Sequence, residues 1–151
     1  IVILRKPERA LRSILDMASR NAAMVAWNTP AKVTEYYCER MESIAETIAS
    51  SGVPWFYSDA ERLLEDTDAL LSELSEWLEL LTPLSPQYER FADTGAFGHG
   101  DTSRQIHSGT VITEGNDYSH VELPRSPMDQ AAAAYESARD ALLALRNGKA
   151  R

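Results

Sequence analysis

The sequence predicts a mainly α-helical fold: a small bundle of about four long helices and one short helix, with a β-hairpin arm before the last helix. Apolar residues recur at spacings of three and four over four long segments, which indicates amphipathic helices. Ser, Thr, Pro and Gly stand at the segment boundaries, where helix caps are expected. At 151 residues the simplest organisation is one domain over 1–151, in which 94–125 form a glycine-rich loop and β-hairpin insertion.

The first two helices are predicted to begin at Pro7 and at Pro30, the second running to about Ser50. Proline suits the first helical turn because the N–H it lacks would have no partner there. Thr29 is the expected N-cap of the second helix, and Gly52 stands where a left-handed C-cap is expected. The residues expected to face the core are Leu11, Ile14, Leu15, Ala18, Ala22 and Val25 in the first helix and Val33, Tyr37, Met41, Ile44 and Ile48 in the second.

The third helix is predicted over 58–81. Ser58 and Glu61 have the spacing of a capping box, in which the two side chains satisfy free backbone donors of the first turn. Thr82-Pro83 ends this helix, and Ser85-Pro86 opens a short helix to about residue 92. The leucines expected to face inward are Leu64, Leu71, Leu74, Leu78 and Leu81.

The hairpin and the last helix complete the predicted fold. The runs Ile106–Ile112 and Tyr118–Leu123 are rich in β-forming residues and flank a turn sequence over 114–117. The last helix is expected to begin at Ser126-Pro127 and to end at Asn147-Gly148. Its expected inward residues are Ala131, Ala134, Tyr135, Ala138, Leu142 and Leu145.

The charge distribution argues against binding to nucleic acid, and the short apolar stretches argue against a membrane span. Residues 58–81 contain eight carboxylates and one cation, Arg62, a local charge of −7 out of a net −8. Binding to a phosphate backbone draws on clustered Lys and Arg, so direct contact with nucleic acid is not expected. The apolar stretches are shorter than the ~20 residues that span a bilayer. Arg5 and Lys6 follow the first apolar run, the reverse of a secretory signal, so we expect a cytoplasmic or virion-like location.

The chemistry-bearing residues do not form a recognisable catalytic, cofactor or metal motif. Cys38 is the only cysteine, and its expected role is a small core or boundary residue rather than a nucleophile. His99, His107 and His120 lie in the glycine-rich stretch and hairpin without the close spacing of metal ligands. The glycines of 95–100 lack the Lys-Ser/Thr ending of a phosphate-binding loop. We therefore expect no enzymatic activity, no cofactor and no metal.

The sequence is interpreted as that of a non-enzymatic structural or interaction protein, a subunit of a homo- or hetero-oligomeric assembly such as a virion or prophage-like particle. The alternative is a small acidic inhibitor, such as an antitoxin, an immunity protein or a nuclease blocker, acting through the helix 58–81. The simpler interpretation of its carboxylates is a solvated face that keeps the protein soluble. The candidate interaction residues are Glu61, Glu65, Asp68, Glu76 and Glu79 on the acidic helix and Ile106, Val111, Ile112, Tyr118 and Val121 on the hairpin.

Overall fold

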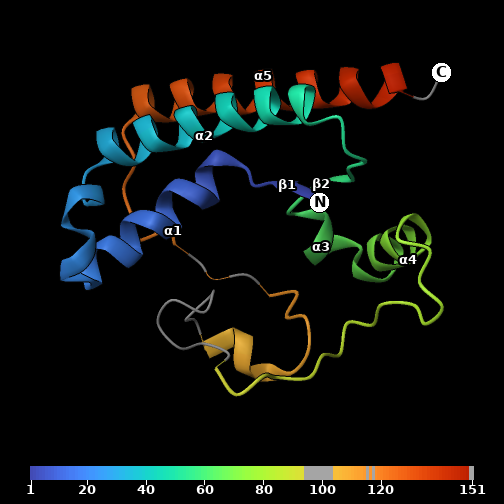
Figure 1. The fold of residues 1–151 in the computed structure, drawn as a ribbon. Coiled ribbons are helices and arrows are strands. Elements are labelled where there is room, and N and C mark those ends of the chain that lie inside the picture. Colours follow the sequence, from blue (N-terminus) through green and yellow to red (C-terminus); the bar gives the residue numbers. More distant parts are fainter. Residues whose placement is uncertain (94–103, 115, 117, 150–151) are drawn as a thin grey trace. The chain divides into compact units, whose positions relative to one another are not determined.

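The computed structural model describes residues 1–93, 104–114, 116 and 118–149, and this part of the chain is mainly helical, as predicted (Figure 1). The α-helices are α1 (Pro7–Arg20), α2 (Pro30–Ser51), α3 (Arg62–Glu65), α4 (Thr67–Trp77) and α5 (Arg125–Lys149). Two 3-10 helices, η1 (Ala22–Trp27) and η2 (Arg104–Ser108), and two strands, β1 (Val2–Leu4) and β2 (Tyr57–Asp59), complete the elements.

These elements divide into two compact units. Unit 1 consists of Ile1–Asp59 and Asp117–Arg151, and unit 2 of Ala60–Asn116. The prediction that 1–151 form one domain stays a prediction. The glycine-rich stretch from 94 to 103, with His99, lies outside the described residues.

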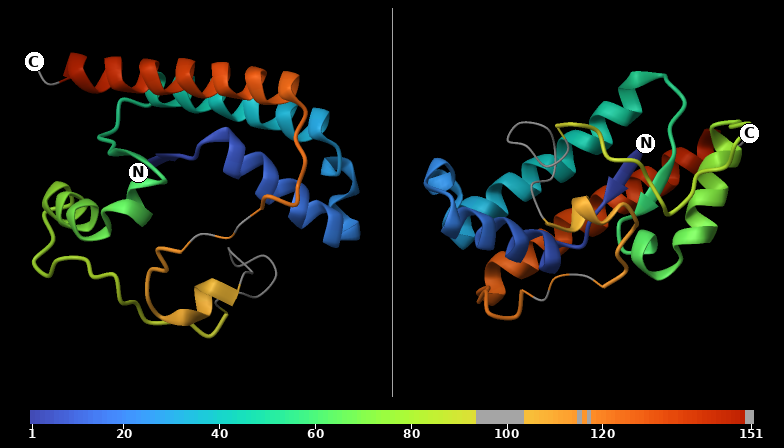
Figure 2. Two further views of the ribbon diagram at one scale, coloured as in Figure 1. Left: turned by 180° about the vertical axis from the view of Figure 1, so that it is seen from behind. Right: turned by 90° about the horizontal axis from the view of Figure 1, so that it is seen from below.

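The hydrophobic core belongs to unit 1, where α1, α2 and α5 pack together with the two strands. Helices α2 and α5 lie side by side along much of their length, as Figures 1 and 2 both show. The small side chains of α5 permit this close approach, since Ala131 and Ala138 are buried in the interface. The buried apolar residues are Val2, Leu4, Ala10, Leu11, Leu15, Val33, Tyr37, Met41, Tyr57, Ala131, Tyr135, Ala138 and Leu142.

The predicted limits of α1 and α2 are largely confirmed. Thr29 caps α2 by accepting a hydrogen bond from the Lys32 N–H over 3.4 Å, and Gly52 ends the helix at φ 65°. Helix α1 begins at Pro7 but ends at Arg20, where the chain turns into η1. The prediction that the buried stripe continues through Ala22 and Val25 is therefore wrong, because both residues lie in η1 and are exposed, Val25 by 65%.

The two strands form a parallel pair that the sequence did not predict. Val2 is opposite Tyr57, Ile3 opposite Ser58 and Leu4 opposite Asp59. Val2 and Leu4 are buried while Ile3 is half exposed, which is the alternation of a strand with one covered face. Three residues are too few to show that alternation in sequence, and the pairing joins segments far apart in the chain.

The single helix predicted over 58–81 is wrong. Ser58 is the middle residue of β2, and its hydroxyl donates to the Asp59 carbonyl over 3.0 Å instead of capping a helix. The remainder forms the short helix α3 and then α4, with a break at Asp66 (φ −148°). Pairing with β1 takes the expected first turn of the helix into the sheet, so local capping signals lose to a tertiary contact.

The predicted β-hairpin is also wrong in the described residues. Residues 104–108 form η2, Thr110 pairs in an isolated bridge with Gln87, and 118–123 form no strand. The bridge also replaces the short helix predicted over 85–92. The two expected strands belong to different units, so they do not pair with each other. An isolated hairpin is also only marginally stable in water, so the β-forming residues alone do not hold one together. Part of the predicted turn, Gly115 and Asp117, lies outside the described residues.

Candidate functional site

A polar cluster inside unit 1 joins β2 to α5. The Asp59 carboxylate accepts hydrogen bonds from the Tyr57 hydroxyl over 2.7 Å and from the Tyr135 hydroxyl over 2.6 Å, both at Oδ1. Arg139 Nε lies 3.7 Å from the other oxygen, Oδ2. Both tyrosines are buried, and the Asp59 side chain is 29% exposed. We call these four residues the Asp59 cluster.

The protonation states of the Asp59 cluster favour a fixed network. Burial works to raise the Asp59 pKa, but the hydrogen bonds from Tyr135 and Tyr57 and the positive charges of Arg139 and Lys6 outweigh it, and the pKa is lowered. Burial, and then the bond to the carboxylate, raise the pKa of Tyr57. Asp59 therefore stays an acceptor and Tyr57 a donor at neutral pH. This arrangement holds α5 against β2 rather than transferring protons.

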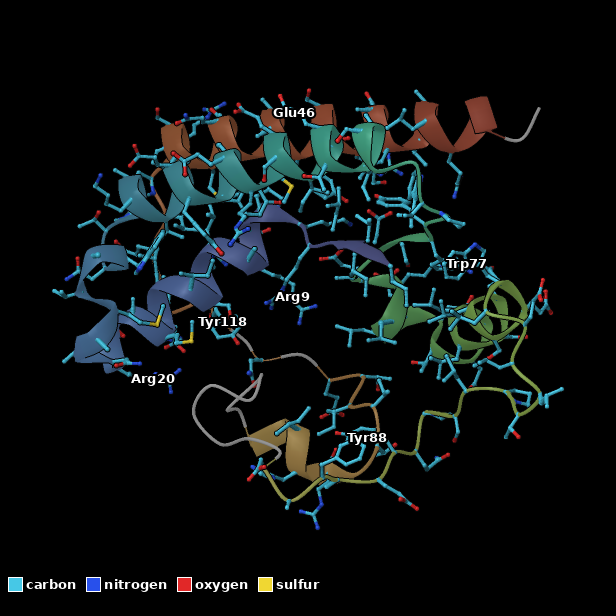
Figure 3. The ribbon with its side chains drawn as sticks, in the orientation of Figure 1. Arg9, Arg20, Glu46, Trp77, Tyr88 and Tyr118 are labelled. Atoms are coloured by element: carbon cyan, nitrogen blue, oxygen red, sulfur yellow. The ribbon has the colours of Figure 1, made fainter. Side chains whose placement is uncertain are left out.

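A second polar group, also in unit 1, attaches the segment after residue 117 to α1. Asp16 Oδ1 lies 3.0 Å from His120 Nε2, and its Oδ2 bonds Arg20 on the next turn. Ser13 donates to the Tyr118 hydroxyl over 3.3 Å, and Figure 3 shows Tyr118 beside α1. The histidine was predicted to stand in a hairpin, whereas the structure places it against a helix by side-chain contacts.

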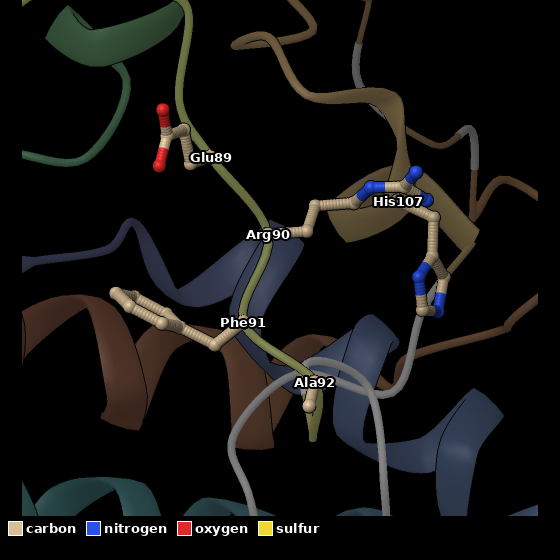
Figure 4. A pocket seen from close by; sticks show the side chains of 5 residues that line it. All are labelled: Glu89, Arg90, Phe91, Ala92 and His107. Atoms are coloured by element: carbon tan, nitrogen blue, oxygen red, sulfur yellow. The ribbon is translucent and has the colours of Figure 1, made fainter.

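A shallow hollow of unit 2 is lined by Glu89, Arg90, Phe91, Ala92 and His107 (Figure 4). The Arg90 side chain extends toward His107, while Phe91 points away from it. Phe91 is 84% exposed, and Glu89, Arg90 and His107 are exposed as well. Solvated side chains of this kind are not held in a fixed geometry, which acid–base catalysis requires.

Neither a metal site nor a reactive cysteine is supported by the described residues. In the described part of the chain, no three His, Cys, Asp or Glu side chains are grouped so that they could hold a metal ion. Cys38 lies within α2 and is half-buried, and burial together with the charge of Glu42 raises its thiol pKa. A raised pKa is the reverse of what a nucleophilic cysteine needs, because the thiolate is the reactive form.

The candidate acidic residues occupy unit 2 but do not share one helix. Glu61 precedes α3 and is buried, Glu65 ends α3, and Asp68 lies in the first turn of α4. Glu76 lies in the last turn of α4 and Glu79 beyond its end. The last four carboxylates are exposed, so the structure leaves four of the five predicted residues at the surface.

The candidate hairpin residues are divided between the units. Ile106, Val111 and Ile112 are half-buried in unit 2, where the Tyr88 hydroxyl donates to the Ile106 carbonyl over 3.1 Å. Figure 3 shows Tyr88 beside η2. Tyr118 and Val121 are half-buried in unit 1, and Val121 packs against its core. These five residues therefore do not belong to one hairpin.

The most distinctive surface of the described chain was not predicted. Leu81 is fully exposed, and the four other large apolar residues between positions 77 and 84 are exposed by 38–41%. Sequence periodicity predicted that Leu78 and Leu81 face inward, which is wrong because α4 ends before them. We call this group the leucine segment: Trp77, Leu78, Leu80, Leu81 and Leu84.

The end of α4 holds the leucine segment in a defined conformation. The Leu80 N–H bonds the Ser75 carbonyl over 3.0 Å and the Glu79 N–H bonds the Glu76 carbonyl over 3.0 Å, which is the Schellman pattern. Glu79 occupies the left-handed position of this pattern at φ 53°, where glycine is usual.

A buried serine then returns the chain to α4. The Ser75 hydroxyl donates to the Leu71 carbonyl over 2.6 Å and accepts from the Leu84 N–H over 2.8 Å. Ser75 is 5% exposed, so this bond is shielded from water. The chain between residues 78 and 84 is thus closed into a loop beside the helix end, and each of its leucines is exposed.

Comparisons with family models, with curated proteins and with solved structures find no match to this chain. Within 1–93, 104–114, 116 and 118–149, no helix is long and apolar enough to cross a membrane.

Proposed function

We propose that this chain is a non-enzymatic interaction protein that docks into a larger protein assembly through unit 2. The observation that carries this proposal is the leucine segment. Five large apolar side chains are exposed within residues 77–84. Large exposed apolar patches are unusual on the surface of a lone protein and mark interaction sites. Trp77 at one end of the segment offers an aromatic side chain of the kind that anchors protein interfaces.

The closed loop supports the same proposal. Exposed apolar side chains on a freely moving loop would lose conformational entropy on binding, which weakens association. Here the Schellman pattern at Glu79 and the Ser75–Leu84 bond hold the backbone of the loop before any partner arrives. A preorganised apolar loop is suited to repeated contact with one partner surface. An assembly such as a virion-like particle is one setting for such a contact.

The acidic-inhibitor alternative is supported by the charges around the leucine segment. Glu76 and Glu79 are exposed beside it, and the described structure shows no ion pair for either. An inhibitor would use these carboxylates to occupy the basic site of a target. The two readings differ in stoichiometry, since an inhibitor pairs with one target and an assembly subunit occurs in many copies.

The experiment compares purification partners of two variants of the full tagged chain, expressed in its source cells. Leu81→Ser/Leu84→Ser should lose the proteins that co-purify with wild type in fixed stoichiometry. Val25→Ser is the control, because Val25 is an exposed apolar residue of unit 1, 65% exposed. Far-ultraviolet circular dichroism checks that both variants keep the helical fold. Unchanged partners for the leucine variant would contradict the proposal.

A further inference from the structure

The stretch of chain that contains the leucine segment is negatively charged as well as rich in exposed apolar residues. Residues 66–84 contain five carboxylates and no Lys or Arg. Glu73 is taken up by Arg62, whose Nη1 donates to its Oε2 over 2.7 Å. The other four, Asp66, Asp68, Glu76 and Glu79, are exposed, and among the described residues none of them forms an ion pair.

The end of α4 adds to this negative charge. The last carbonyl groups of a helix carry a partial negative charge, which disfavours nearby carboxylates and favours cations. Glu76 lies in the last turn of α4 and Glu79 two residues beyond Trp77, so both add to the unfavourable end of the dipole. A cationic side chain brought to this end would be attracted by both carboxylates and by the helix terminus.

On this basis, and resting on the proposed function, we propose that the partner contributes a basic amphipathic helix whose apolar face covers the leucine segment. A second copy of this chain docking by the same surface would place carboxylates against carboxylates, which is repulsive. A partner strand could not add to a sheet edge at this surface, because residues 66–84 contain no strand. Side chains must therefore supply the contact. A helix with apolar residues at spacings of three and four and a basic rim fits both features.

The test uses two fluorescent synthetic helices with the same leucine face. One carries lysines on its polar face and the other carries glutamates, and binding to the full chain is followed by fluorescence anisotropy. The lysine helix should bind wild type at least tenfold more tightly than the glutamate helix. This preference should weaken as salt is added, because exposed charges are screened.

Three variants locate the binding surface. Glu76→Gln/Glu79→Gln should weaken binding of the lysine helix at least threefold, and Leu81→Ser/Leu84→Ser at least tenfold. Glu42→Gln/Glu46→Gln is the matched control, because it removes the same charge from exposed positions of α2 and should change the affinity less than twofold.

Several outcomes would overturn the inference. They are equal binding of the two helices, no binding of either, or an equal effect from the control pair. Self-association of wild type in sedimentation that the leucine variant abolishes would identify a second copy as the occupant and would also overturn it. If co-purification depends on Leu81 and Leu84 while charge has no effect on helix binding, the proposed function stands and only the basic partner fails. If the lysine helix binds as expected and no partner co-purifies with wild type, the proposed function fails instead.

Discussion

Replacing Asp59 by alanine should destabilise unit 1 more than its position near the surface suggests. The Asp59 carboxylate is the acceptor for two buried phenols, those of Tyr57 and Tyr135, at 2.7 and 2.6 Å. Alanine removes the acceptor and leaves both hydroxyls in place. Because each tyrosine is less than a tenth exposed, water cannot readily replace the lost oxygen.

The magnitude follows from these two bonds. A buried donor left without its partner costs about 1–3 kcal/mol, so two such donors cost about 2–6 kcal/mol. The Asp59 side chain is 29% exposed, and water entering the vacated space restores part of that loss. We therefore expect Asp59→Ala to lower the free energy of unfolding by about 2–4 kcal/mol. The ion pair with Arg139, at 3.7 Å and partly solvated, adds little to this figure.

The assay is urea unfolding of the full chain, followed by circular dichroism and extrapolated to water. The control is the double variant Tyr57→Phe/Tyr135→Phe, which has no hydroxyls to leave unpaired. In that background Asp59→Ala should cost less than about 1 kcal/mol, because the interaction it removes is already absent. An equal cost in both backgrounds, or a loss below about 0.5 kcal/mol in wild type, would refute the assignment of the cluster as a clamp on α5.

The same carboxylate and the end of α4 give three further predictions. The folded-state pKa of Asp59 is lowered, so its charged form stabilises the fold above its unfolded pKa of about 3.9. This stabilisation is lost as the pH falls through the folded-state pKa. In unfolding curves, the stability difference between wild type and Asp59→Asn should therefore shrink below about pH 4. Glu79→Gly should raise the free energy of unfolding by about 0.5–1 kcal/mol, since relief at φ 53° exceeds the entropy that glycine adds to the unfolded chain; a loss of stability would contradict the Schellman assignment. Leu70→Ala should cost about 2–5 kcal/mol and Leu81→Ala less than about 0.5 kcal/mol, because Leu70 is 6% exposed and Leu81 is fully exposed. Equal losses in thermal denaturation would mean that α4 has been placed with the wrong face inward.

The sequence by itself determined the long helices of unit 1. Pro7, Thr29, Pro30 and Gly52 act through the backbone of the residues next to them, so their effects can be read locally, and α1 and α2 begin or end where they indicate. The apolar stripes of α2 and α5 point to the core for the same reason, because a helix of this length repeats its pattern several times. Val33, Tyr37, Met41, Ala131 and Leu142 are buried as expected.

Periodicity failed where the segments are short or where a distant partner competes. The capping-box spacing of Ser58 and Glu61 is a local signal, yet pairing of β2 with β1 places Ser58 in a sheet. The helical spacing of leucines in 58–81 continues past Trp77, where α4 ends. Because the spacing does not show where the helix ends, it wrongly assigned Leu78 and Leu81 to the core. The two runs of β-forming residues were equally misleading, because they belong to different units and do not pair as a hairpin.

Tertiary structure alone decided the candidate surface and the Asp59 cluster. The cluster joins Asp59 to Tyr135 and Arg139, which are far apart in the chain and share no motif. The leucine segment depends on where α4 stops and on the Ser75–Leu84 hydrogen bond, neither of which has a local sequence signal of its own. Composition did locate the excess of carboxylates in this region. Whether those charges border a core or an exposed apolar loop is set by long-range packing, which a pattern of neighbouring residues does not encode.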